Sequence, residues 1–86
     1  MNPIARVAIP ESTPTDLVDA IKRHLGNSYP HITIEYELKA DIDQPIALSF
    51  DRNGAGLGGI DGNMDTPSIA IISGIHIEAN RAFRRV

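Results

Sequence analysis

The stretch with the clearest chemical potential is residues 51–65, DRNGAGLGGIDGNMD, which holds five of the chain's seven glycines. Glycine lets successive backbone N–H groups turn inward and line an anion. Arg52 stands at the entrance of this stretch and could supply positive charge. We therefore expect residues 52–63 to bind an anionic small molecule such as a nucleotide.

The same glycines match a dinucleotide-binding pattern when taken literally. Gly54, Gly56 and Gly59 give G-x-G-x-x-G. That pattern holds a pyrophosphate only when it follows a strand and opens a helix. The residues that follow, IDGNMDTP, are poor helix formers, so we do not expect a dinucleotide-binding fold. The phosphate-binding loop of nucleotide triphosphatases is also excluded, because Ile60 stands where its lysine is required.

A calcium site is the second alternative in this stretch. Asp61, Asn63 and Asp65 match the first three ligand positions of an EF-hand loop, but Thr66 and Ile72 replace its glycine and its final glutamate. A weak site of another kind, using Asp51, Asp61 and Asp65, stays open. So does a purely structural connection with turns at residues 53–54 and 61–62. We predict no metal and no cofactor.

Further candidate ligand contacts lie near the C-terminus. Residues 79–86 form a basic tail that carries Arg81 and Arg84, and it is either solvated or in contact with an anion. His76 and Glu78 would share one face of a strand, which leaves a small enzyme with an acid–base pair as an alternative; we predict no catalytic residue. The predicted ligand-binding residues are Arg52, Asn53, Gly54, Gly56, Gly58, Gly59, His76, Arg81 and Arg84.

The elements that must position these residues follow from hydrophobic periodicity. Residues 4–9 alternate as a strand, and residues 14–25 place an apolar residue every four positions behind a Thr13 cap, ending at Gly26, as in an amphipathic helix. Residues 31–39 and 45–51 alternate again and predict an antiparallel hairpin. Residues 68–78, SIAIISGIHIE, predict a fourth strand in which Gly74 marks a bulge or the close approach of another backbone.

These elements predict an α+β fold in the order β-α-β-β-β, a four-stranded mixed sheet with one helix on one face. We expect one domain over residues 1–86, with a glycine-rich loop at 52–66 and the basic tail at 79–86. A sheet covered on one side only leaves a half-polar face, and a core this small is marginally stable. We therefore expect a homo-oligomer.

The opening PIARVAI, followed by a helix, resembles the start of the small tautomerases, which begin on a catalytic proline with a free amine. Here Pro3 follows Met1 and Asn2, so its nitrogen is an amide without basicity. The glycine-rich stretch and the following strand do not match that family. Tautomerase activity is therefore not carried over to this chain.

Composition limits the possible functions and the location of the protein. The chain has 86 residues, no cysteine and a formal net charge of −3, which disfavours bulk nucleic-acid binding because that needs clustered cations. No signal peptide or membrane-length apolar run is visible, so we expect a cytoplasmic protein. The sequence therefore predicts a non-enzymatic binding protein for an anionic small molecule. The alternative is a protein-interaction module or inhibitor that acts through its acidic surface or a strand edge.

Overall fold

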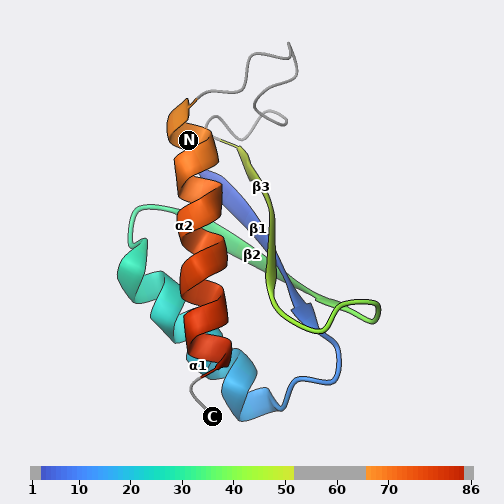
Figure 1. The fold of residues 1–86 in the computed structure, drawn as a ribbon. Helices are drawn as coiled ribbons and strands as arrows, with labels where there is room; N and C mark the ends of the chain where they lie inside the picture. The colour runs from blue at the N-terminus through green and yellow to red at the C-terminus, as the bar shows by residue number, and fades with distance from the viewer. Residues whose placement is uncertain (1–2, 52–65, 85–86) are drawn as a thin grey trace.

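The computed structural model describes residues 3–51 and 66–84, with side chains in the second range from Ile69. The chain runs β1(Ile4–Pro10), α1(Thr15–Ser28), β2(Thr33–Lys39), β3(Ile46–Asp51) and α2(Thr66–Phe83). Both helices pack against the same face of the sheet (Figure 1). The fold is therefore α+β, as predicted, but the described residues form three strands and two helices in place of four strands and one helix.

Strand β1 is the centre of the sheet, whose order is β2-β1-β3. It pairs parallel with β2 and antiparallel with β3. The predicted hairpin between β2 and β3 is wrong, because β1 lies between them. Strands two places apart in a sheet are separated by about 10 Å. The connection over residues 40–45 can span up to about 20 Å, so it passes the end of β1 without strain.

A bulge in β3 decides which of its side chains reach the core. The pairing with β1 shifts between Arg6 and Val7, whose partners are Ser49 and Ala47, so Leu48 is left over. Phe50 and Ala47 contact the core, whereas Leu48 is 39% exposed. Strict alternation over residues 45–51 would place Leu48 on the same buried face as Phe50. It fails at the bulge, where the strand gains one residue.

Helix α1 covers the sheet with the apolar stripe that its sequence predicts. Ile21 and Leu25 are fully buried and join Val7 and Ile9 of β1 in one core cluster. The helix ends differ from the prediction. Thr13 forms no capping hydrogen bond and Gly26 lies inside the helix, which continues to Ser28.

Residues 66–83 form the helix α2, so the predicted fourth strand is wrong. Ile75, Ala79 and Ala82 are buried and follow the helical spacing i, i+4, i+7. Ile77, which a strand would bury beside Ile75, is 51% exposed. The isoleucines alternate strictly only as far as Ile77, whereas the helical spacing continues through Ala82. Tertiary burial therefore selects the longer pattern over the β propensity of isoleucine.

Tyr29, the residue after α1, packs against α2 at Gly74. A Cβ atom added to Gly74 would fall inside the contact radius of Tyr29 Oη, with Tyr29 Cζ at 3.6 Å. The close approach expected at Gly74 therefore exists, but a side chain makes it rather than another backbone. Glycine at this position lets the end of α1 lie close to α2.

The glycine-rich stretch leads from β3 to α2, and residues 52–65 lie outside the described residues. A helix does follow it, contrary to the prediction, since α2 begins at Thr66. The dinucleotide-binding alternative still fails on topology, because β3 is antiparallel to β1 and no further strand follows α2 up to residue 84. Within the described ranges, no helix combines the length and apolarity needed to cross a membrane.

Candidate anion-binding hollow

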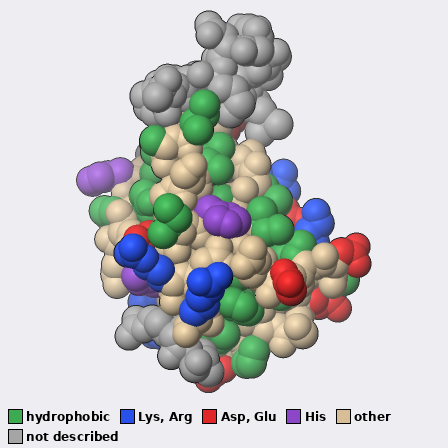
Figure 2. All heavy atoms as spheres, in the orientation of Figure 1, with side chains coloured by type: hydrophobic (Ala, Val, Ile, Leu, Met, Phe, Trp, Pro, Cys, Tyr) green, Lys and Arg blue, Asp and Glu red, His purple; other side chains and the backbone are tan. Residues whose placement is uncertain are grey.

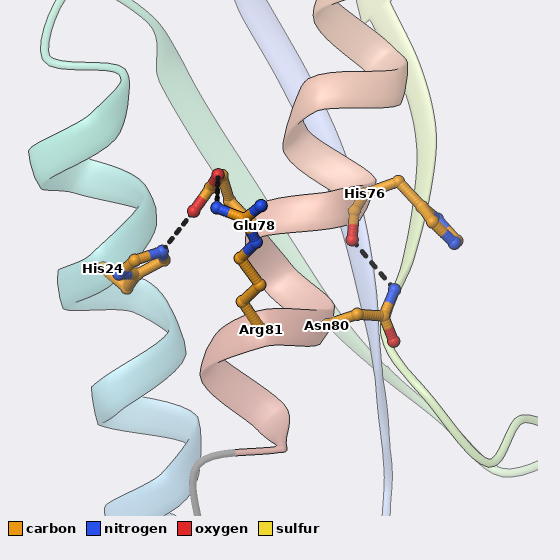
Figure 3. Close-up of polar contacts among 5 residues, drawn as sticks. All are labelled: His24, His76, Glu78, Asn80 and Arg81. Atoms are coloured by element: carbon orange, nitrogen blue, oxygen red, sulfur yellow. Dashed lines mark hydrogen bonds and ion pairs between the residues drawn. The ribbon is translucent and has the colours of Figure 1, made fainter.

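Helix α2 has three faces, each in a different environment. Its apolar residues face the core, Glu78 faces α1, and His76 lies on the side of β3 (Figure 3). Residues two apart on a helix are separated by about 200° around its axis. His76 and Glu78 therefore cannot form the side-by-side pair expected of a strand, and the geometry on which the acid–base alternative rested is absent.

A surface hollow of about 350 Å³ lies along the C-terminal half of α2. Figure 2 shows histidine and cationic side chains close together on the face that carries this helix. None of the described residues that line the hollow is acidic. They are Gln44, His76, Ile77, Asn80, Arg81 and Arg84.

Asn80 fixes the wall of the hollow. Its Nδ2 donates hydrogen bonds to the carbonyl oxygens of Pro45, at 3.2 Å, and His76, at 2.8 Å. The first bond ties α2 to the residue immediately before β3, and the second lies within α2 and holds the Asn80 side chain against the helix. The Oδ1 atom of Asn80 is buried and accepts no hydrogen bond from the described residues. Asn80 therefore acts chiefly as a structural link that holds the neighbouring side chains in place.

A long hydrogen bond from the sheet favours one tautomer of His76. The backbone N–H of Ala47 in β3 donates a long hydrogen bond of 3.4 Å to His76 Nδ1. A nitrogen that accepts carries no proton, so the proton of the neutral ring lies on Nε2. His76 therefore offers an N–H donor from Nε2, the nitrogen on the far side of the ring from β3.

The two arginines of the hollow differ in their partners. Arg81 Nη1 donates to Glu78 Oε2 at 3.2 Å, and its side chain is 70% exposed. Arg84, one turn further along, forms no ion pair with any described residue. An exposed pair of this kind contributes little to stability, so Glu78 holds Arg81 only weakly. Arg84 is therefore unpaired among the described residues, and Arg81 can exchange a weak pair for a contact with a ligand.

Glu78 links the two helices through a second contact. His24 Nε2 of α1 lies 2.6 Å from Glu78 Oε1 (Figure 3), and both side chains are partly buried. The same carboxylate therefore receives His24 from one side and Arg81 from the other. It therefore links α2 to α1 on the side of α2 that faces away from β3.

Both tyrosines of the chain have raised pKa values. Burial raises the pKa of Tyr29, and the nearby carboxylate of Glu78 raises it further. Burial alone raises the pKa of Tyr36 to about 12. The Lys22 ammonium lies 5.3 Å from the centre of the Tyr36 ring, in a cation–π contact. Neither tyrosine lines the hollow.

Three of the nine predicted ligand-binding residues lie together in the structure. His76, Arg81 and Arg84 all line one hollow. Gln44 and Asn80 were missed, although Asn80 stands four residues after His76 and would share its face on a helix. The signal becomes visible only when residues 66–83 are assigned as helix. The other six predicted residues lie outside the described residues: Arg52, Asn53, Gly54, Gly56, Gly58 and Gly59.

Residues 3–51 and 66–84 contain no cluster of histidine and acidic side chains that could hold a metal ion. Comparisons with protein-family models, with curated proteins and with solved structures gave no match for this chain. The chemistry of the hollow is therefore the basis for a functional proposal.

Proposed function

We propose that this chain is a non-enzymatic binding protein that holds a small anionic molecule, such as a nucleotide, in the hollow beside α2. The proposal rests on the surroundings of Arg84. Arg84 shares a hollow with a second arginine and a histidine, and it has no acidic partner among the described residues. Guanidinium groups recognise phosphate through paired N–H donors, so two of them in one hollow favour a phosphate-bearing ligand.

The neutral groups suit the same ligand. His76 Nε2–H and the side-chain amide of Gln44 can donate to phosphate or sugar oxygens. Ile77 is 51% exposed beside them and offers an apolar surface to a base or another flat group. A volume of about 350 Å³ is at the small end of ligand sites, which favours a mononucleotide over a dinucleotide.

The charge of the hollow is opposite in sign to the net charge of the chain. The chain has a net charge of −3, and yet the described lining of the hollow holds only cationic and neutral groups. A local cationic region on an acidic protein attracts a small anion but disfavours a long polyanion. This is why the proposal concerns a small molecule and not bulk nucleic acid.

Calorimetric titration with AMP, ADP, ATP and inorganic phosphate at fixed ionic strength tests the proposal, with adenosine as the uncharged control. We expect saturable binding of the phosphate compounds and none of adenosine alone. Arg84→Gln should weaken binding about tenfold, because a hydrogen bond to a charged group contributes on the order of 1.5–3 kcal/mol when shielded and less when exposed.

Arg23→Gln is the matched control, since Arg23 is an exposed arginine on α1 that does not line the hollow. It removes the same charge, so a general electrostatic effect would weaken binding in both variants alike. Equal affinities for Arg84→Gln and Arg23→Gln would contradict the proposed site. The absence of saturable binding to every anion would contradict the proposed function.

A further inference from the structure

Strand β2 has one unpaired edge. Among the described residues it is the end strand of the sheet and pairs only with β1. The Thr33 N–H donates to the Pro3 carbonyl at 2.9 Å, and the Lys39 carbonyl accepts from the Glu11 N–H at 2.9 Å. Both groups therefore point towards β1 and the chain next to it.

Backbone groups of successive residues in a strand point to opposite edges. Because Thr33 and Lys39 point inward, the alternate residues Ile34, Tyr36 and Leu38 direct their N–H and C=O groups to the free edge. A row of this kind is a template for strand addition by an extended peptide.

A groove lies beside this edge, between β2 and α1, with a volume of about 370 Å³. Its apolar lining comes from Ile9, Val18, Tyr36 and Leu38. Leu38 is 58% exposed, more than any other large apolar side chain in the described ranges. An added strand would turn every second side chain towards this groove, so apolar residues at those positions would cover Leu38.

The face of β2 opposite the groove determines which charges suit the alternate residues of an added strand. Glu35 and Glu37 lie on that face, and Glu37 pairs with Arg6 at 3.1 Å. Glu35 is exposed and forms no ion pair with a described residue. Opposite charges at facing positions of neighbouring strands stabilise the pairing. A basic residue next to Glu35 would therefore complete the match.

In the register centred on Tyr36, the same charges disfavour a second copy of this chain as the occupant. Two β2 strands that pair antiparallel in this register place Glu35 of one copy directly opposite Glu37 of the other, twice. Like charges at facing positions are destabilising. We propose that the free edge of β2 binds an extended segment of a partner protein in which apolar and basic residues alternate. This inference is independent of the anion-binding hollow on α2.

A short, capped peptide that alternates valine and lysine is the probe, and one that alternates valine and glutamate is its control. Titration of the full chain, followed by amide NMR, should give saturable shifts at Ile34, Tyr36 and Leu38 with the lysine peptide only. Equal binding of the two peptides, shifts away from β2, or no binding would overturn the proposal.

Backbone pairing is tested separately by N-methylation of the peptide. Methyl groups on the amides that face β2 should abolish binding, whereas methyl groups on the alternate amides should leave it intact. Equal effects of the two methylation patterns would exclude strand addition.

The charge match is tested with Glu35→Lys, which should weaken peptide binding about tenfold because it replaces a favourable facing pair with an unfavourable one. Asp43→Lys makes the same charge change at an exposed position between β2 and β3 and should have little effect. Both variants are checked for native circular dichroism. Equal loss in the two variants, or a dimer in sedimentation whose affinity Glu35→Lys changes and Asp43→Lys does not, would overturn the proposal in favour of general electrostatics or self-association.

Discussion

The contact between Gly74 and Tyr29 gives a sharp prediction about helix α2. Alanine is more favourable than glycine inside a helix by about 1 kcal/mol. Gly74→Ala should nevertheless not stabilise the protein, because the added methyl group collides with Tyr29 Oη. The tyrosine ring must move off its packed position, and overpacking of this kind costs about 1–3 kcal/mol. We expect a net effect between neutral and about 2 kcal/mol of destabilisation.

Two controls isolate the collision from helix propensity. Gly26 lies in α1 with no atom within 4 Å of the position of an added Cβ. Gly26→Ala should therefore raise the free energy of unfolding, by about 0.5–1 kcal/mol. In a Tyr29→Phe background the colliding oxygen is gone and the next atom, Cζ, lies at an ordinary contact distance of 3.6 Å. There Gly74→Ala should also stabilise.

Urea denaturation followed by circular dichroism measures all four members of the Gly74/Tyr29 cycle, with equal slopes as the condition for comparison. We expect a coupling free energy of about 1–3 kcal/mol between the two substitutions. If Gly74→Ala stabilises the protein containing Tyr29 as much as Gly26→Ala does, or if the coupling is zero, the packing of Tyr29 on α2 is refuted.

Two further predictions concern burial. Ile75→Ala should lower the free energy of unfolding by about 2–5 kcal/mol because Ile75 is buried, whereas Ile77→Ala at a half-exposed position should change it by less than about 1 kcal/mol; equal losses in denaturant melts would favour the strand interpretation. Stability should also fall as the pH rises from about 10 towards about 12, because unfolded Tyr36 loses its proton at the ordinary pKa of 10.0 whereas burial raises the folded pKa to about 12. Thermal melts across this range should show a smaller loss of stability for Tyr36→Phe than for the unsubstituted chain. The absorbance titration of Tyr36→Phe should lack the tyrosinate transition at the higher pH. An unchanged titration in that variant would contradict the assignment of the raised pKa to Tyr36.

The first three strands and the first helix were predictable because each buries one face with a single period. Val7 and Ile9 alternate along β1, and Ile21 and Leu25 repeat every four residues along α1. The order of the strands was not predictable in this way. A short connection between β2 and β3 is compatible both with a hairpin and with a crossing past the end of β1, and local sequence does not distinguish the two.

Helix α2 was missed because its isoleucines satisfy two periods at once. Ile69, Ile71, Ile75 and Ile77 alternate, while Ile75, Ala79 and Ala82 repeat with helical spacing. An alternating run of eleven residues is long for a strand. The helical pattern also continues through the helix-forming residues of the supposed tail. Those two facts, both present in the sequence, favour the helix.

The assignment of residues 68–78 to a strand also separated the residues of the candidate site. His76 was assigned to a strand face and Arg81 and Arg84 to a tail. The sequence interpretation therefore named all three as ligand contacts without a geometry that brings them together. On a helix they fall within about two turns, and Asn80 lies between them. Gln44 joins them only through the packing of α2 on β3. Such a contact between distant segments depends on tertiary structure and has no local signal.

The most direct test of the proposed function is an amide NMR titration of the full chain with ATP at constant ionic strength. We predict saturable shifts that centre on Gln44 and residues 76–84, and saturation at about tenfold higher ATP concentration in Arg84→Gln. Saturation at the same ATP concentration in Arg84→Gln, shifts that centre elsewhere in the described ranges, or no shifts at all would contradict the proposed site.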